Sequence, residues 1–447
     1  MNLGATRAQP PRNALRIADW RGWLPAALAT DGVGRAGLAG LYLLAFGYVA
    51  SKPLANVGLA LVAAAFLVTL VRCPSQWRDD PLVRVGIAWL VYVAALVAWR
   101  AHRQMPGSLL GAENLCLALI PAIAWATAGR VPRIVVALLL MLAGLLVRLA
   151  LDIRSIGWPW FDYSNTPYMF GVNRNISSLM LDTAIVGVLV WLLSSLRAAR
   201  HESGHWWGVA GRAALLVALL GPWIAAPSRT LWLSLVVVVA LMLARLSAHS
   251  RKWIVLIVAG TVVAVVVLML NTGHFGTILL KDVDTWRVLL AGDWSSVPDS
   301  SSGYRFRMLQ MGFEALAANP WTGVANAGAQ ILREHPDFPL SYVVQLHNGY
   351  LEILVRTGLV GFGFFAVALT LAFRAMRNAA GDGRIPWELR ELLLAGLQLF
   401  LLVNLTNAVV FFQHGWQFLV IFSGIAYGFA SGHQAPKEAA GADDPVC

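Results

Sequence analysis

Residues 345–361 read Gln-Leu-His-Asn-Gly-Tyr-Leu-Glu-Ile-Leu-Val-Arg-Thr-Gly-Leu-Val-Gly, and they join a long polar segment to an apolar helix. The histidine of this stretch, His347, stands at the junction. Steps of four and three residues lead from His347 through two leucines to Gly358 and Gly361, which predicts that these residues share one helix face. Small residues on such a face let another helix approach closely. The stretch therefore predicts a helix with His347 at the membrane boundary and two glycines in a helix-packing seam.

The composition around this stretch indicates a membrane protein. Of the 447 residues, 58% are hydrophobic and only 13% are charged, whereas charged residues make up about 25% of a soluble domain. The net charge of +11 does not indicate a nucleic-acid partner, because the arginines are scattered over short loops instead of forming one stripe. We expect membrane lipids, and no nucleic acid, around this chain.

Apolar runs of about 20 residues, the length of a transmembrane helix, predict an all-α polytopic protein with about twelve spans. These lie near residues 33–50, 53–71, 82–99, 114–128, 134–151, 177–196, 207–226, 230–246, 253–271, 350–373, 390–412 and 416–431. The predicted organisation is an N-terminal tail, spans one to nine, a large loop, spans ten to twelve and a C-terminal tail, over residues 1–31, 32–271, 272–349, 350–431 and 432–447.

Lysines and arginines in the loops predict the orientation. Twenty of them fall on the side of the N-terminus. The opposite side holds six in its short loops, namely Lys52, Arg100, Arg103, Arg154, Arg174 and Arg229. This bias predicts that both termini are cytoplasmic and that the loop 272–349, partly helical, faces outward.

Two outward-facing positions suit chemistry on an anionic substrate. The imidazole of His347 can take a proton from an attacking hydroxyl near neutral pH, although it could also only hydrogen-bond a neighbouring carbonyl. Arg229 follows Pro227 and Ser228 in a very short hairpin. A guanidinium at the first turn of a helix suits a phosphate, but Arg229 could instead anchor the hairpin at the membrane surface.

Two more polar sites lie on the same predicted side. Ser301 and Ser302 can cap a helix from about Tyr304 to Ala318, which places Arg305 in its first turn. Arg305 is then turned away from an apolar stripe of Phe306, Leu309, Phe313 and Leu316. Arg305 could also be an ordinary solvated arginine, and Arg307 must point elsewhere because it is rotated by about 200°. The other site is the group of Asn173, Arg174 and Asn175, whose amides could hold sugar hydroxyls or, for Asn175, cap the next helix.

The remaining charged groups suggest no metal or cofactor site. Asp282 and Asp284 form an Asp-x-Asp pair, a pattern that recurs by chance in long loops, and we expect no metal there. Glu352 and Arg356 are spaced i to i+4 and predict an ion pair that neutralises itself within the membrane. The chain contains no phosphate-binding glycine loop and no zinc motif, so we expect no cofactor.

Several of these motifs resemble the O-antigen ligase and polymerase superfamily. His347-Asn348, nine residues and then Gly358 are similar to its His-Asn-x9-Gly signature, and Arg305 followed by the Asn-Pro-Trp-Thr-Gly turn ending at Gly323 is similar to its arginine helix. The tryptophan usual in that helix is Leu309 here. Twelve spans and an outer loop between the ninth and tenth also resemble this family and its GT-C-like fold.

The resemblance implies a metal-independent, inverting glycosyl transfer at the periplasmic face of the bacterial inner membrane. The donor would be a glycan on undecaprenyl diphosphate and the acceptor a hydroxyl of the lipid A-core. His347 would be the general base, and Arg229 and Arg305 would bind the donor diphosphate and stabilise it as it leaves. Asn348 and the group 173–175 would contact the substrates.

Three alternatives stay open from the sequence. An O-antigen polymerase would use the same donor but a different acceptor. A protein O-oligosaccharyltransferase usually carries an additional outer domain after its spans, whereas here the predicted tail is short and cytoplasmic. A lipid or glycan transporter would need charged residues along a path through several spans, and Asp182, Glu352 and Arg356 are too few for that.

Overall fold

A computed structural model describes residues 31–105, 109, 111–156, 168–170, 172–199, 206–225, 228–246, 255–256, 259–260, 283–293, 296–325 and 345–430. Its main helices are α2 (Gly32–Ala50), α3 (Lys52–Arg72), α5 (Pro81–His102), α6 (Cys116–Thr127), α7 (Val131–Ile156), α8 (Arg174–Ala199), α9 (Trp206–Ala225), α10 (Arg229–Arg245), α14 (Ser301–Ala318), α16 (Gly349–Gly381), α17 (Trp387–Val403) and α18 (Gln413–Gly428). The shorter elements are α4 (Pro74–Trp77), η2 (Ala112–Leu115), α13 (Val283–Leu290), η5 (Val409–Phe411) and the strands β1 (Tyr168–Met169) and β2 (Val172–Asn173).

This architecture confirms an all-α, multi-pass membrane protein. Within the described residues, six helices are long and apolar enough to cross a membrane, namely α2, α3, α5, α7, α8 and α16. Ala112–Thr127 and Thr230–Arg245 are shorter apolar helices. Most of the predicted span 253–271 lies outside the described residues, so the total of twelve stays a prediction.

The structure corrects the eleventh predicted span, 390–412, which ends as a helix at Val403. The side chain of Asn404 explains this end, because its Nδ2 donates to the carbonyl of Phe400 at 2.8 Å and its Oδ1 accepts from the N–H of Val410 at 3.1 Å. The amide thus bonds the backbone on both sides of a turn. Residues 404–412 form a mostly buried link to α18 that contains no α-helix but includes the 3-10 helix η5, and we call it the α17–α18 link.

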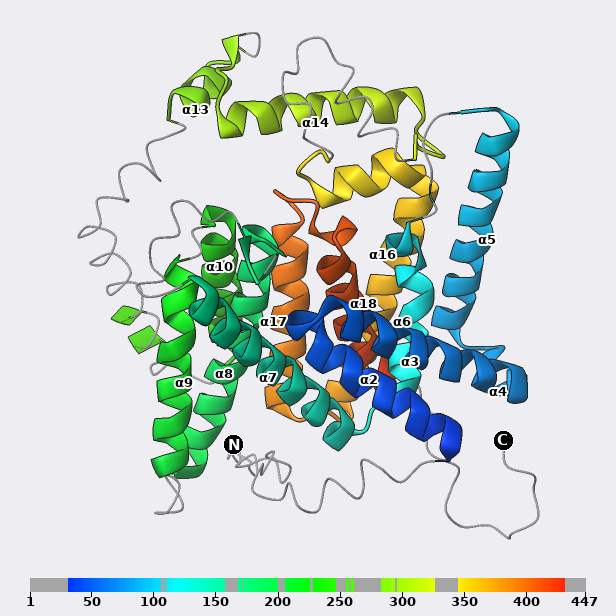
Figure 1. Cartoon of the computed structure of the whole chain (residues 1–447). Coiled ribbons are helices and arrows are strands. Elements are labelled where there is room, and N and C mark those ends of the chain that lie inside the picture. The colour runs from blue at the N-terminus through cyan, green and yellow to red at the C-terminus, as the bar shows by residue number, and fades with distance from the viewer. Residues whose placement is uncertain are drawn as a thin grey trace, which may run out of the picture.

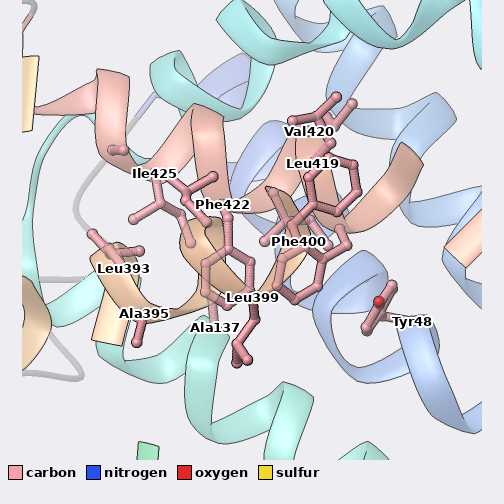
Figure 2. Close-up of a cluster of buried hydrophobic side chains, with 14 of the residues drawn as sticks. Tyr48, Ala137, Leu393, Ala395, Leu399, Phe400, Leu419, Val420, Phe422 and Ile425 are labelled. Atoms are coloured by element: carbon pink, nitrogen blue, oxygen red, sulfur yellow. The ribbon is translucent and has the colours of Figure 1, made fainter. Parts of the chain in front are cut away.

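Helix α18 forms the centre of the bundle (Figure 1). All its residues from His414 to Gly428 are buried, as expected for a helix with protein on every side. Phe400 and Phe418 stack with ring centroids 5.9 Å apart, and Phe418 stacks on Phe422 at 4.2 Å. Figure 2 shows side chains of α17 and α18 meeting Tyr48 of α2 and Ala137 of α7 in this core.

Close backbone contact between α2 and α3 depends on small residues. A Cβ on Gly40 would lie 2.8 Å from the carbonyl oxygen of Gly58, and a Cβ on Gly58 would lie 2.3 Å from the N–H nitrogen of Leu44. Small residues at such contacts allow van der Waals packing between membrane helices, where burial of apolar surface adds little. These two helices therefore form a tightly packed hairpin on the side of the core.

Helix α14 lies across one end of the bundle, over the first turns of α16 (Figure 1). It begins three residues earlier than predicted, because Ser300 is the N-cap and its Oγ accepts from the N–H of Gly303 at 3.0 Å. Its buried face also differs from the predicted stripe, since Met308 and Met311 are buried whereas Phe313 is 60% exposed. The two methionines pack against three side chains from the start of α16 and the residues before it, namely Leu346, Leu351 and Val355.

Candidate active site

His347 lies in a turn before α16 and not on the helix. The helix begins at Gly349, and Asn348 is its N-cap, whose Oδ1 accepts from the N–H of Leu351 at 2.9 Å. His347 has a φ of 53°, the left-handed conformation that a non-glycine residue adopts only where its surroundings hold it. The predicted helix face that starts at His347 is therefore wrong, because the cap and the left-handed turn separate the imidazole from the helix.

Hydrogen bonds on both sides of His347 hold this turn. The N–H of Leu346 donates to Oε2 of Glu352 at 2.7 Å. The N–H of Gly349 donates to the carbonyl of Asn404 at 2.7 Å, and Nδ2 of Asn348 donates to the carbonyl of Leu405 at 3.0 Å. The α17–α18 link therefore fixes the turn from one side and Glu352 fixes it from the other.

Glu352 and Arg356 form the predicted ion pair, with 2.7 Å between Oε1 and Nε. Arg356 also lies 3.6 Å from Oε1 of Glu113 and 4.0 Å above the ring of Phe411. A guanidinium over an aromatic face gains a cation–π interaction. The pair thus joins the start of α16 to the segment before α6 and to the α17–α18 link, in addition to neutralising its own charge.

A chain of amides and hydroxyls connects His347 to two other predicted elements. Asn407 lies beside the imidazole, whose pKa it raises, and its Oδ1 accepts from Nδ2 of Asn175 at 2.6 Å. Oδ1 of Asn175 in turn accepts from Oγ of Ser228 at 2.9 Å. This chain brings together the histidine, the group 173–175 and the hairpin before α10, three sites far apart in the sequence.

The two asparagines before α8 have different roles from those predicted. Asn173 caps α8, since its Oδ1 accepts from the N–H of Asn175 at 2.9 Å, so Asn175 is free to make the bonds to Asn407 and Ser228. Ser228 is the N-cap residue of α10, but its side chain makes no capping bond because it donates to Asn175 instead. The antiparallel strands β1 and β2, which pair Tyr168 with Asn173, hold the start of α8 in place.

Arg305 lies close to His347. The pKa of His347 is lowered to about 4, first by burial, which disfavours the charged ring, and second by the positive charge of Arg305, while the nearby amide of Asn407, which favours the charged ring, raises it. Arg307 is directed elsewhere, as predicted, with Nη1 2.8 Å from Oδ1 of Asp299 and Nη2 2.7 Å from the carbonyl of Val297. Because α14 begins at Ser301, Arg305 occupies its second turn and not its first.

Arg174 and Arg229 are placed by their backbones only. Arg174 is the first residue of α8 and Arg229 the first residue of α10, and the positions of their side chains lie outside the described residues. Their neighbours Asn175 and Ser228 belong to the chain of hydrogen bonds that leads to His347. Both arginines therefore start helices whose N-terminal, electropositive ends lie at the same site.

Gly358 and Gly323, each part of a motif noted in the sequence, lie against each other. Gly358 breaks α16 with a φ of 67° and a ψ of −173°, a conformation open almost only to glycine. A Cβ on Gly358 would lie 2.1 Å from the carbonyl oxygen of Trp321, and a Cβ on Gly323 would lie 2.4 Å from the carbonyl oxygen of Val355. Gly358 therefore packs against the turn after α14 and not in a helix seam, and Gly361 has only Thr357 of its own helix at this distance.

The break in α16 leaves some backbone N–H and C=O groups without partners inside the helix, and the turn after α14 forms hydrogen bonds with them. The N–H groups of Val324 and Ala325 donate to the carbonyls of Val355 and Arg356 at 2.6 and 3.0 Å, and the N–H of Leu359 donates to the carbonyl of Pro320 at 2.8 Å. Oη of Tyr92 on α5 donates to the carbonyl of Thr357 at 2.6 Å. Non-helical backbone at membrane depth is tolerated when protein pairs it in this way. We call this contact of residues 320–325 with the break in α16 the glycine clamp.

The glycine clamp positions the site. It ties the C-terminal end of α14 to the first segment of α16. Arg305 lies near the other end of α14, and His347 lies just before α16. In Figure 1 that first segment lies across the bundle beneath α14, and the rest of α16 runs down through the bundle. The break therefore lets one helix both span the bundle and present its N-terminal turn to α14.

The arrangement can hold an anion beside a neutral proton acceptor. Nδ1 of His347 is buried and has no hydrogen-bond partner among the described residues, and the ring is uncharged near neutral pH because of its lowered pKa. A phosphate bound at Arg305 would screen the positive charge and raise the pKa of the imidazole again. The imidazole would then become a better base when an anionic substrate is present.

Asn407 is the site residue that the sequence analysis missed. It lies in the run 390–412, which composition alone predicts to be one span. The signal that could have revealed it is the series Asn404, Thr406 and Asn407 within an apolar run, because amides at membrane depth are costly unless they are bonded to protein.

Replacing Arg305 by Gln should raise the pKa of His347 toward its ordinary value near 6.5, since one of the two causes of the lowering is removed. Asn407→Ala should lower this pKa further, because the bond that favours the charged ring is lost. NMR titration of ¹³C-labelled histidines in the full chain would measure both shifts, with the His347 signal assigned by His347→Gln. Arg307→Gln is the matched control, and an unchanged pKa in Arg305→Gln would contradict the proposed proximity.

The direction of the shift also sets the effect of pH on stability. Because the folded chain has the lower pKa at His347, it binds fewer protons than the unfolded chain between about pH 4 and pH 6.5. The contribution of this residue to the free energy of unfolding therefore decreases as the pH falls through that interval. The same residue has no such effect at neutral pH, where both states hold a neutral ring.

Only one aspartate of the Asp-x-Asp pair, Asp284, lies within the described residues. Asp284 forms an ion pair with Arg287 on the exposed helix α13, with 3.2 Å between Oδ1 and Nη1, and Asp282 lies outside the described residues. Within the parts of the chain that the structure describes, no three potential metal ligands come together.

Comparison with known proteins gives one family. Residues 213–366 match the family described as O-antigen ligase, a range that runs from α9 into α16 and includes Arg229, Arg305, Gly323, His347 and Gly358. Asn175 and Asn407 lie outside the matched range. A search of curated proteins finds no match to the chain.

Proposed function

Because residues 213–366 match the family described as O-antigen ligase, we propose that this chain is an O-antigen ligase of lipopolysaccharide biosynthesis. It would transfer a glycan from undecaprenyl diphosphate to a hydroxyl of the lipid A-core. The reaction would take place at the periplasmic face of the bacterial inner membrane, without a metal ion and with inversion at the anomeric carbon.

The observation that carries this proposal is the meeting of His347 and Arg305 within the matched range. The pKa of the imidazole is lowered both by burial and by Arg305, so a base that is neutral near pH 7 lies within electrostatic reach of a group that binds anions. Glycosyl transfer from a lipid diphosphate needs both, a proton acceptor for the attacking hydroxyl and cations for the leaving diphosphate.

Each of these residues would have a separate role in the glycosyl transfer. The acceptor oxygen forms a bond to the anomeric carbon while the bond from that carbon to the diphosphate oxygen breaks on the opposite face, which inverts the configuration. His347 takes the hydroxyl proton, and the diphosphate leaves with the bonding electron pair. Arg305 and Arg229 bind the diphosphate and stabilise its increasing charge.

The asparagines would orient this machinery. The amides of Asn348 and Asn175 are already bonded within the protein, so in the substrate-free protein they hold the His347 turn and the start of α8. Asn173 and Arg174 lie at the same helix start and would contact the sugar. Asn407 would set the orientation of the imidazole, as partners of catalytic histidines commonly do.

The loop charges support an orientation in which this site faces the periplasm. With both termini in the cytoplasm, the segment 272–349 and the turn of His347 face the periplasm, where a membrane-bound lipid diphosphate and the lipid A-core share one surface. The donor is already activated, so the reaction requires no nucleotide.

Transfer by the purified full-length protein in nanodiscs tests the proposal. We expect a defined undecaprenyl-diphosphate glycan to be transferred to lipid A-core when that acceptor competes with a second molecule of donor, and we expect the same rate in excess EDTA. Mass spectrometry of the lipid products would distinguish the two acceptors, and donor alone would serve as the control.

Three outcomes would overturn parts of this assignment. Longer glycans on undecaprenyl diphosphate, with no product on lipid A-core, would identify a polymerase. Loss of transfer in EDTA with rescue by a divalent ion would contradict the metal-independent mechanism. Movement of the donor across the bilayer with no transfer to either acceptor would indicate a transporter.

A further inference from the structure

A pocket lined by arginines lies at the end of the bundle opposite to His347. Its four arginines come from three helices, with Arg245 at the end of α10, Arg374 and Arg377 on α16 and Arg390 on α17. The pocket has a volume of about 740 Å³. It shares no residue with the site around His347.

The charge of this pocket is only partly compensated. Glu391, which is fully buried, accepts from Nε of Arg245 at 3.0 Å and from Nη2 of Arg390 at 2.7 Å. Arg374 and Arg377 form no ion pair within the described part of the chain and are exposed. One carboxylate against four guanidinium groups leaves three positive charges, an excess that suits an anion with more than one oxygen.

The remaining lining is apolar. Four of the side chains, Phe373, Met376, Ala380 and Leu394, are hydrophobic, and one, Thr370, carries a hydroxyl. Fixed cations beside an apolar wall match a molecule with an anionic end and a hydrocarbon end. A small hydrophilic anion would use only the first of these features.

The position of the pocket along the helices corresponds to a membrane surface. Arg245 lies sixteen residues after Arg229 on α10, a rise of about 24 Å at 1.5 Å per residue, close to the hydrocarbon thickness of about 30 Å. Since Arg229 starts its helix at the level of the His347 site, Arg245 and its neighbours lie near the other membrane surface, where lipid headgroups are found.

We propose that this pocket binds the headgroup phosphate of an anionic phospholipid. The two unpaired guanidinium groups, Arg374 and Arg377, contact the phosphate oxygens. The acyl chains lie along Phe373 and Leu394. Glu391 holds Arg245 and Arg390 in place beside them. Arginines that served only to orient the chain in the membrane would not need to enclose one pocket from three helices.

The test uses the full-length protein stripped of lipid in dodecyl maltoside, titrated with dioleoyl phosphatidylglycerol, with dioleoyl phosphatidylcholine or with inorganic phosphate. Native mass spectrometry counts bound lipid, and thermal unfolding measures stabilisation. Of the three ligands, we expect only phosphatidylglycerol to bind and to raise the midpoint temperature of thermal unfolding. The double variant Arg374→Gln/Arg377→Gln should weaken binding by roughly 30-fold, as two surface charges at about 1 kcal/mol each predict.

A matched control removes the same charge elsewhere. Arg35 and Arg78 are also exposed and have no ion-pair partner among the described residues, so Arg35→Gln/Arg78→Gln should bind phosphatidylglycerol like the unchanged protein. If both double variants lost phosphatidylglycerol binding equally, the binding would depend on the total charge of the protein and not on this pocket. If inorganic phosphate stabilised the protein as much as phosphatidylglycerol, the ligand of the pocket would be phosphate and not a lipid. Absence of phosphatidylglycerol binding to the unchanged protein would overturn the site itself.

Discussion

Replacing His347 by Ala is expected to lower glycan transfer by about 100- to 10,000-fold, the usual contribution of a general base. The attacking hydroxyl would then have to lose its proton to water, while the arginines proposed to bind the diphosphate stay in place. Donor binding should therefore change little. Single-turnover transfer and binding of labelled donor, measured on the same purified protein, would separate the two effects.

His102 provides the control for this experiment, since it is an exposed histidine at the end of α5 with no part in the proposed site. His102→Ala should transfer at the rate of the unchanged protein. Unchanged turnover in His347→Ala would remove the general-base assignment. Loss of donor binding together with transfer would instead give His347 a role in binding.

Gly358→Ala is expected to have the largest effect on stability. The φ of 67° and ψ of −173° would be strained for alanine, at about 1–3 kcal/mol, and the new Cβ would lie 2.1 Å from the carbonyl oxygen of Trp321, which adds about 1–3 kcal/mol for overpacking. The glycine clamp would open and the turn after α14 would move away from α16. We expect a lower thermal midpoint and a loss of transfer, because Arg305 and His347 would no longer be held together.

Gly363 is the matched glycine for this substitution, because it lies on the same helix and a Cβ there meets nothing within 4 Å. Gly363→Ala should be neutral or stabilise α16 by up to about 1 kcal/mol, the difference in helix propensity. If Gly358→Ala had the same midpoint and activity as Gly363→Ala, the glycine clamp would have no role in holding the site.

Much of the fold was predictable because a membrane helix requires a continuous apolar run of about 20 residues, which is visible in the sequence. Apolar length alone placed α2, α3, α5, α7 and α8 to within a few residues of their observed ends. The same criterion failed for 390–412, where Asn404 ends the helix through bonds to Phe400 and Val410. Apolar residues can be buried in a turn as well as in a helix, and composition does not distinguish the two.

The site was predictable in its members but not in its geometry. Helical spacing placed His347, Gly358 and Gly361 on one face, yet the Asn348 cap and the break at Gly358 put each of them in a different environment. A periodic pattern describes a helix only where the helix is continuous. The contact between Gly323 and Gly358 and the bonds of Asn407 join distant parts of the chain, and no local pattern contains them.

The bonds of the α17–α18 link to the histidine turn also determine when the site can form during synthesis. Asn404 and Leu405 bond to Gly349 and Asn348, and Asn407 lies beside the imidazole, but these three residues leave the ribosome more than fifty residues later. Until α17 has entered the membrane and the chain has turned back after it, the imidazole lacks both its asparagine partner and the backbone bonds that fix its turn. A nascent chain therefore carries Arg229, Arg305 and His347 before these bonds can form, and the proposed site is complete only as the last helices insert.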